Sequence, residues 1–460
     1  MDPSARHRVM AIGGTDLARG LRASVGSALF TAVLMLIFVT LSPLPDRSDA
    51  GLLGTLEGGA IANQIVFPLI AAALLAYLWA TKRWVLHALY HPILWVVAAW
   101  LALTILTSQD PLLSARRMMF NAIVIVIAAL MAALPRTRDD FADGLAIAAG
   151  AVLIGCYGGV MLWPDHAIHL ATDALEADLA GDWRGLFPHK NQAGAVMVLL
   201  IFFGLFYARV RSFPIGWIIV TAATVFLYFT KSKTSIAMAP FILAMSLILP
   251  HLRSLTAKAM LVFGLLAIFN LATIGSSVPG PVRSVVRLVL PDATFTGRTD
   301  LWAFAIDNIE AKPVFGHGYG AFWRTEATAH RDRIAVEPQE QDGWAAELGT
   351  DAHNGYLETA LSIGIPGLVI VLIWVMIVPL ADYQRIKRTP VNEDLVALFL
   401  RIWLLGLYLA SLESILLDRT GQNWFMLLVS IFAMRLLINA KIAIPAPGRS
   451  PSLGELEGKH

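Results

Sequence analysis

The sequence is poor in cysteine and in charged residues. Cys156 is the single cysteine among 460 residues, so neither an intramolecular disulfide nor a cysteine-based metal site can form. Charged residues make up 15% of the chain and hydrophobic residues 57%. Because a soluble globular protein has about 25% charged residues, this composition excludes an ordinary soluble enzyme and indicates a protein whose solvent is a lipid bilayer.

Two further absences limit the chemistry. Asp-x-Asp, the carboxylate pair that usually holds a divalent metal on a nucleotide-sugar, occurs nowhere in the chain. The formal net charge of +2 is too small to indicate a nucleic acid or another strongly charged macromolecule as partner. We therefore expect no metal ion, no other cofactor and no nucleic acid.

Apolar runs recur along nearly the whole sequence. A helix of about 20 residues crosses a hydrocarbon core of about 30 Å, so each run predicts a membrane-spanning helix, and the expected fold class is an all-α polytopic membrane protein. We count about twelve such spans by hydropathy. The predicted spans are residues 25–42, 61–80, 93–107, 118–134, 145–163, 192–208, 214–230, 235–250, 257–275, 356–380, 396–416 and 422–440.

The distribution of Lys and Arg predicts the orientation of these spans. Loops that would share a side with the N-terminus carry most of the basic residues, which places both termini in the cytoplasm. The predicted regions are a cytoplasmic tail at 1–24, nine helices within 25–275 with an outer loop near 164–191, a large outer loop at 276–355, three helices within 356–440, and a cytoplasmic tail at 441–460.

The outer loop at 276–355 is too long to be structureless in a compact protein. Apolar spacing predicts a short helix near 282–289 that lies along the membrane surface. A second helix is expected after Gly297, with Arg298 in its first turn. Pro313 and the glycines that follow it predict a tight turn at the end of this helix.

Three outer side chains form the leading candidate site: Arg184, Arg298 and His353. Histidine can accept a proton near neutrality, and arginine binds phosphate through a planar, permanently charged fork. This set suits the attack of a hydroxyl group on a sugar carried by a lipid pyrophosphate, with arginine in place of a metal. Simpler readings are a solvated His353, an Arg298 that contacts lipid phosphates, and an Arg184 paired with Asp182 or another acid of its loop.

Four further basic residues fall on the outer side, against the general charge bias. These are Arg116, Arg117, Lys231 and Lys233. They are candidate ligands for an anionic lipid-linked substrate, and the alternative is that they extend to lipid headgroups at the membrane surface.

Three short stretches in a fixed order resemble the O-antigen ligase and Wzy-type polysaccharide polymerase superfamily. The similarity covers roughly residues 183–380. The stretches are WRGLFPHKN at 183–191, GRTDLW at 297–302 followed by Lys312-Pro313 and a glycine-rich turn, and DAHNGYLE at 351–358 followed by Gly-Ile-Pro-Gly at 364–367. Pro188 departs from the pattern, because a glycine is more usual at that position.

The resemblance implies a metal-independent, inverting glycosyltransferase at the periplasmic face of a bacterial inner membrane. Its donor would be a glycan linked to undecaprenyl pyrophosphate. Arg184 and Arg298 would bind the pyrophosphate, His353 would activate the acceptor hydroxyl, and Lys190 and Asn191 would assist.

The forms of the first and third motifs, with Leu412-Glu413-Ser414 in the eleventh predicted span, are most similar to exopolysaccharide polymerases. A polymerase would use a lipid-linked repeat unit as acceptor and would work with chain-length regulator and export proteins. A ligase would transfer the glycan to a lipid A core or to protein. A lipid-linked sugar transporter is the third hypothesis, but it needs ionisable groups within the membrane, and only Arg401, Glu413 and Arg435 lie plainly inside predicted spans.

Overall fold

The computed structural model confirms the all-α class. Every regular element among the described residues is a helix, and the one extended pairing there is an isolated bridge between Ile168 and Trp183. The described residues are 25–39, 61–135, 137–172, 177–277, 280–289, 298–323, 351–389 and 392–438.

Eight helical segments of the described chain are long and apolar enough to cross a membrane, which makes this a multi-pass membrane protein. They are α3 (Ile61–Thr81), α6 (Pro111–Met131), α7 (Arg138–Leu162), α9 (Lys190–Val210), α10 (Phe213–Thr230), α11 (Lys233–Ile248), the run from α12 (Leu255–Ala259) to α13 (Leu265–Thr273), and the run from α18 (Gly355–Leu372) to α19 (Val378–Arg385). Shorter helices occupy the other predicted spans, so a count of twelve is not confirmed. These are Val25–Val39, α5 (Pro92–Leu106), α20 (Glu393–Leu409) and α21 (Gln422–Leu437).

Three of the predicted boundaries shift, two of them at polar caps. Helix α6 begins at Pro111, because the Asp110 carboxylate accepts a hydrogen bond from the backbone of its first turn. Helix α7 begins at Arg138 behind a capping box of Thr137 and Asp140. Helix α20 ends at Leu409, so the placement of Glu413 inside the eleventh span is wrong. Glu413 lies in the connection between α20 and α21, residues 410–421.

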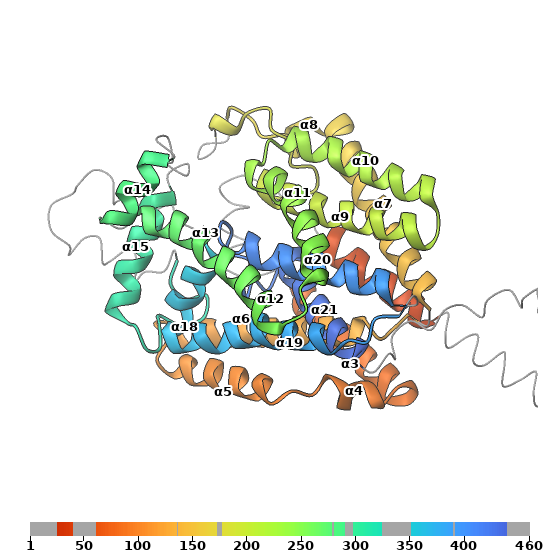
Figure 1. The fold of residues 1–460 in the computed structure, drawn as a ribbon, viewed down its shortest axis with the longest axis horizontal. Helices are drawn as coiled ribbons and strands as arrows, with labels where there is room; N and C mark the ends of the chain where they lie inside the picture. The colour runs from red at the N-terminus through yellow and green to blue at the C-terminus, as the bar shows by residue number, and fades with distance from the viewer. Residues whose placement is uncertain are drawn as a thin grey trace, which may run out of the picture.

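Helix α9 is the central helix of the bundle. Of its apolar stretch 72% is buried, a larger share than in the other seven candidate spans, and it packs against α7, α10, α11 and α20 (Figure 1). Gly204 and Gly216 allow α9 and α10 to approach closely, because a Cβ at Gly204 would lie 2.8 Å from the Gly216 carbonyl oxygen and a Cβ at Gly216 would lie 2.4 Å from the Ala208 nitrogen.

Contacts between distant segments sort the helix ends into two groups. At one end, Arg138 lies 3.4 Å from Asp394, and Arg211 lies 3.0 Å from Asp143, which joins the starts of α7 and α20 to the end of α9. At the other end lie the start of α18 and the 410–421 connection, joined by a hydrogen bond from the Gly355 N–H to the Ala410 carbonyl.

The described residues of the long predicted outer loop form two helices at the expected positions. They are α14 (Pro281–Val289) and α15 (Arg298–Ala311), which lie with the start of α18 at one end of the molecule (Figure 1). Helix α15 packs on α18 through Trp302, Ala305 and Leu361. Arg298, the first residue of α15, is thereby held near the start of α18.

The turn at 316–320 follows α15. Its three glycines all have positive φ, at +67°, +103° and +66°, a region that disfavours other residues. His317 within the turn is fully buried, and its ring nitrogens contact the Gln109 side chain at 2.7 Å and the Asn308 carbonyl at 2.9 Å. These contacts support a structural role for His317.

Candidate functional site

Asn354 fastens the third motif to the 410–421 connection. Its side-chain oxygen caps α18 by accepting hydrogen bonds from the N–H groups of Tyr356 and Leu357, at 3.0 and 3.1 Å. Its amide nitrogen donates to the Ser411 carbonyl at 2.8 Å, and its own N–H donates to the Ser414 hydroxyl at 3.2 Å. Because the side chain is fully buried, these bonds set the position of the residue just before it.

That residue, His353, is constrained from the other side as well. Trp302 donates from its indole nitrogen to the Ala352 carbonyl at 3.1 Å, and the Ala352 N–H donates to Glu358 at 2.9 Å. His353 adopts φ +44°, a left-handed conformation that costs free energy in a residue other than glycine. Its N–H donates to the Asp351 carboxylate at 2.7 Å, which supports this turn.

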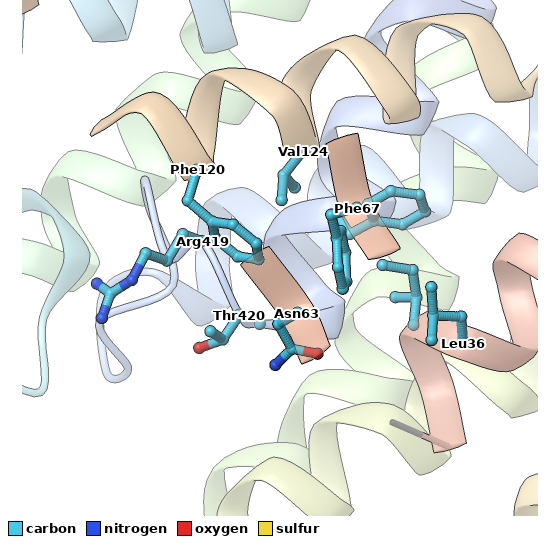
Figure 2. A pocket seen from close by; sticks show the side chains of 10 residues that line it. Leu36, Asn63, Phe67, Phe120, Val124, Arg419 and Thr420 are labelled. Carbon is cyan, nitrogen blue, oxygen red and sulfur yellow. The ribbon is translucent and has the colours of Figure 1, made fainter. Parts of the chain in front are cut away.

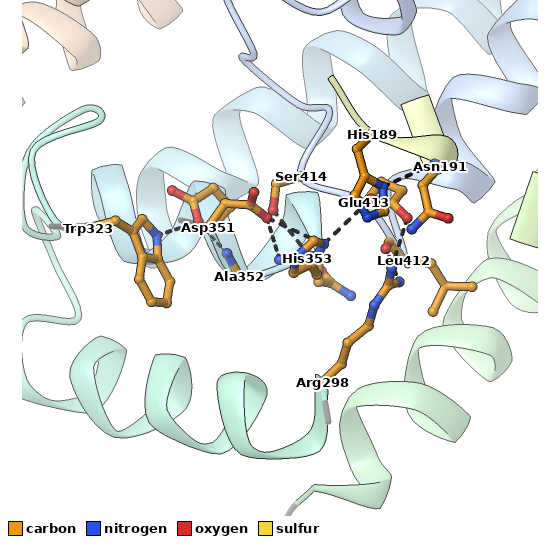
Figure 3. A network of polar contacts seen from close by, with 12 residues as sticks. His189, Asn191, Arg298, Trp323, Asp351, Ala352, His353, Leu412, Glu413 and Ser414 are labelled. Atoms are coloured by element: carbon orange, nitrogen blue, oxygen red, sulfur yellow. Dashed lines mark hydrogen bonds and ion pairs between the residues drawn. The ribbon is translucent and has the colours of Figure 1, made fainter. Parts of the chain in front are cut away.

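The two ring nitrogens of His353 have different surroundings (Figure 3). Nδ1 is buried and faces two carboxylates, 3.6 Å from Glu413 Oε2 and 3.8 Å from Asp351 Oδ1. The side chain as a whole is 33% exposed, although its Nδ1 is buried. The Asp351 carboxylate, with Glu413 adding to it, raises the pKa of His353 against the opposing effects of burial and Arg298.

Glu413 joins His353 to Arg298. Its Oε1 accepts from Arg298 Nη2 at 2.9 Å, while Oε2 faces the imidazole. Arg298 also donates from Nη1 to the Leu412 carbonyl. Burial by itself would raise the pKa of Glu413, but the Arg298 guanidinium and His353 lower it to about 2. Glu413 is therefore ionised at any physiological pH.

Arg184, in the first motif, is held by backbone carbonyls. It is 1% exposed, and its guanidinium donates from Nε to the His166 carbonyl at 2.9 Å and from Nη2 to the Asp165 carbonyl at 3.3 Å. These bonds attach the first motif to α8 (Pro164–Ala167). The contacts support a role in holding this loop, and pyrophosphate binding by Arg184 stays a prediction.

Asp182 binds two of the other predicted cations. Lys190 Nζ lies 2.6 Å from one carboxylate oxygen and Lys231 Nζ lies 2.7 Å from the other. Burial raises the pKa of Asp182, but hydrogen bonds from the two lysines outweigh it and the pKa falls below its usual value. The suggested pairing of Asp182 with Arg184 is therefore replaced by a pairing with lysines. Lys233 is exposed at the start of α11.

Asn191, the second residue of α9, lies near the Arg298–His353 pair in Figure 3. His189 caps the helix by accepting the Asn191 N–H on its Nδ1 at 3.1 Å. The next residue, Gln192, donates to Gln422 at 2.8 Å and so holds the start of α9 against the start of α21. Figure 3 shows His189 and Asn191 on the side of the network where Glu413 lies.

Arg116 and Arg117 lie in the second turn of α6. Arg117 donates from Nη1 to the Gly320 carbonyl, in the glycine-rich turn. This bond joins the start of α6 to the glycine-rich turn, and substrate binding by Arg116 and Arg117 stays a prediction.

Two acids of this centre, Glu413 and Asp351, were not predicted as site residues. Glu413 was interpreted as a charge within a span, and only its position in the Leu412-Glu413-Ser414 triplet singled it out. Glu413 directly follows a long apolar run in a chain with few charges, and this unusual position could have indicated a functional role. Among the described residues no three His, Cys, Asp or Glu side chains are grouped so that they could hold a metal ion.

Part of the chain matches a known protein family. Residues 196–372 match the family model Wzy_C, described as O-Antigen ligase. The chain carries an O-antigen ligase domain. This Wzy_C domain includes Arg298 and His353, while Glu413 lies beyond it, and it is the domain of O-antigen ligase-like membrane glycosyltransferases. No curated protein matches the sequence.

Proposed function

We propose that the protein polymerises undecaprenyl-pyrophosphate-linked oligosaccharide repeat units into exopolysaccharide or O-antigen. The observation that supports this proposal is the bridging of Arg298 and His353 by Glu413. The proposal takes His353 as the proton acceptor and Arg298 as the phosphate-binding cation, two side chains that share Glu413 as a neighbour. A transfer from a lipid pyrophosphate to a sugar hydroxyl needs both groups.

In this proposal His353 is the general base. Its Nε2 accepts the proton of the acceptor hydroxyl as the oxygen forms a bond to the anomeric carbon of the donor sugar. The imidazolium that forms faces Asp351 and Glu413 through Nδ1, so both carboxylates stabilise it. The bond from the anomeric carbon to the pyrophosphate oxygen breaks on the opposite face, which inverts the configuration.

Arg298 takes the negative charge of the leaving pyrophosphate. A guanidinium has five N–H donors, and the bonds to Leu412 and Glu413 use only some of them. The side chain is 11% exposed, so the remaining donors act in a largely dry environment where a charge-assisted hydrogen bond is strong. Arg298 would then do the work that a divalent metal does in other glycosyltransferases.

We also propose the finer topology. Twelve spans, with both termini in the cytoplasm and the Arg298–His353 centre in the periplasm, would account for the sorting of helix ends into two groups and for the basic residues of the predicted inner loops. Arg184, Lys190 and Asn191 would hold and complete the loop that faces the donor. A chain-length regulator and export proteins would be its partners.

Purified protein incubated with a defined lipid-linked oligosaccharide tests the proposal. Elongated product should form in buffer with EDTA, and loss of turnover on chelation would contradict a metal-independent reaction. His353→Ala and Arg298→Ala should abolish elongation, and Arg298→Lys should impair it because an ammonium cannot make the bidentate contact. His251→Ala and Arg253→Ala, at exposed positions of the loop before α12, are matched controls that should keep activity.

The family description favours ligation as a second candidate function. The two reactions share a donor and differ in acceptor, so the pool of lipid-linked glycan in a deletion strain separates them. Loss of a polymerase leaves single repeat units on the carrier. Loss of a ligase leaves long chains on the carrier and none on lipid A core or protein.

A further inference from the structure

Glu358 connects three segments of the chain. It lies in the first turn of α18 and is partly buried. Its Oε2 atom accepts two hydrogen bonds, one from the Ala352 N–H at 2.9 Å and one from the Trp323 indole N–H at 2.8 Å. One carboxylate oxygen thereby joins the residue directly before His353 to the segment that follows the glycine-rich turn. In Figure 3 Trp323 lies on the opposite side of His353 from Glu413.

Both backbone polar groups of Ala352 are held by side chains. The N–H donates to Glu358, and the carbonyl accepts from the Trp302 indole at 3.1 Å. Ala352 is itself fully buried, so its orientation is fixed. The next residue, His353, has φ +44°, a conformation that persists only where surrounding contacts hold it. Glu358 therefore supports His353 on the side opposite to Asn354.

Trp323 holds the Glu358 carboxylate in place. Its ring packs against Phe304 of α15, with centroids 5.9 Å apart, and against Phe322, with centroids 5.1 Å apart. These contacts fix the plane of the indole, and therefore the direction in which its N–H donates. The Glu358 oxygen that accepts this bond is the same one that accepts the Ala352 N–H.

We propose that Glu358 is a positioning residue for the catalytic base and that Trp323 acts through it. The inference rests on the proposed function, in which His353 accepts the proton of the acceptor hydroxyl. A general base must lie within hydrogen-bond reach of that proton, and a misplacement of about 1 Å can cost about 100-fold in rate. Glu358 acts through the Ala352 backbone, so it does not need to contact the substrate.

The role of Glu358 depends on the reach of its side chain and not on its charge. Besides burial, three charged side chains shift the pKa of His353, those of Asp351, Glu413 and Arg298. Glu358 is not one of them. A change of its charge should therefore leave the pKa of the base where it is, whereas a change of its length should move the base.

The Glu358 contacts are separate from the pocket shown in Figure 2. That pocket is lined mainly by apolar side chains, among them Phe67 and Phe120, and neither Glu358 nor either of its two donors lines it. A substitution at Glu358 therefore leaves the lining of this pocket unchanged. A loss of turnover can then be assigned to the third motif.

Three substitutions of Glu358 separate reach from charge. Glu358→Gln keeps the length and an acceptor oxygen, Glu358→Asp keeps the charge on a shorter side chain, and Glu358→Ala removes both. In elongation assays kcat should fall less than about fivefold for the Gln variant and about 30-fold to 100-fold for the Asp and Ala variants. The acidic limb of the pH profile should stay in place in all three. Trp323→Phe should cost less than Glu358→Ala, because the bond to Ala352 remains.

Hydrogen–deuterium exchange on the full chain in detergent gives a readout that does not depend on turnover. The Ala352 amide should exchange faster in the Asp and Ala variants than in wild type and the Gln variant. Glu310→Ala, at an exposed position of α15, is the matched control and should change neither kcat nor exchange. Melting curves show which fraction of each variant is folded.

The inference is overturned if Glu358→Asp keeps more activity than Glu358→Gln, since the charge would then matter more than the reach. It is also overturned if the folded fraction of Glu358→Ala has the kcat of wild type, as a merely structural role would predict, or if its Ala352 amide exchanges at the wild-type rate. Failure of the proposed function has a different signature, in which the exchange rates differ as expected but wild type forms no elongated product.

Discussion

Glu413→Gln is the most informative change at the proposed centre. Glutamine has the shape of glutamate and can still accept a hydrogen bond from Arg298, but it removes the charge that faces His353. Without that charge the imidazolium formed during proton transfer is less stable, so kcat should fall. Arg298 keeps its place and loses its competing carboxylate, so the KM for the donor should stay the same or decrease.

The size of the effect follows from the geometry. Opposite unit charges 3.6 Å apart, the distance from His353 Nδ1 to Glu413 Oε2, attract by about 4–5 kcal/mol at an effective dielectric constant of about 20. The His353 side chain is 33% exposed, and solvent screening lowers this to about 2–3 kcal/mol. The expected decrease in kcat is therefore between about 30-fold and 200-fold.

The assay measures elongation of a lipid-linked oligosaccharide at several donor concentrations, so that kcat and KM are separated. Glu393→Gln, the same substitution in the exposed first turn of α20, is the matched control. Size-exclusion profiles and melting in detergent report whether loss of a buried charge partner unfolds the variant. A folded Glu413→Gln enzyme with kcat within about threefold of wild type would refute the role of Glu413 in stabilising the imidazolium.

Three further changes have defined outcomes. Asp351→Asn removes the largest influence that raises the pKa of His353, and since the base must be neutral to act, the acidic limb of the kcat/KM profile should move to lower pH; a shift to higher pH would contradict this assignment. Asn354→Ala removes a helix cap and a buried hydrogen bond to Ser411, and thermal denaturation in detergent should show a loss of about 2–4 kcal/mol. Arg184→Ala should lower the melting temperature through loss of the bonds to the 165–166 carbonyls; full activity in the fraction that stays folded would remove Arg184 from the pyrophosphate site.

Much of the fold could be predicted from local sequence patterns. Each of the predicted spans contains a helix, because a run of apolar residues both favours a helix and requires a lipid environment for it. The helix that begins at Arg298 and the glycine turn at 316–320 were also predicted, since periodicity and glycine act within a few residues. The motifs that single out Arg298 and His353 as candidates have the same short range.

The arrangement of the site was decided by tertiary structure. Glu413 is 115 residues from Arg298 in the sequence, and nothing near either residue indicates that they pair. Likewise, the residues near Arg184 and Asp182 in the sequence do not indicate which partner each side chain contacts. In the folded chain Arg184 donates to carbonyls of α8, and Asp182 pairs with two lysines. Hydropathy and helix capping depend on residues that are neighbours in the sequence, whereas the pairing of charges depends on which helix ends meet in the folded protein. The sequence alone therefore determined the helices and two side chains of the centre, and only their packing made one carboxylate the link between them.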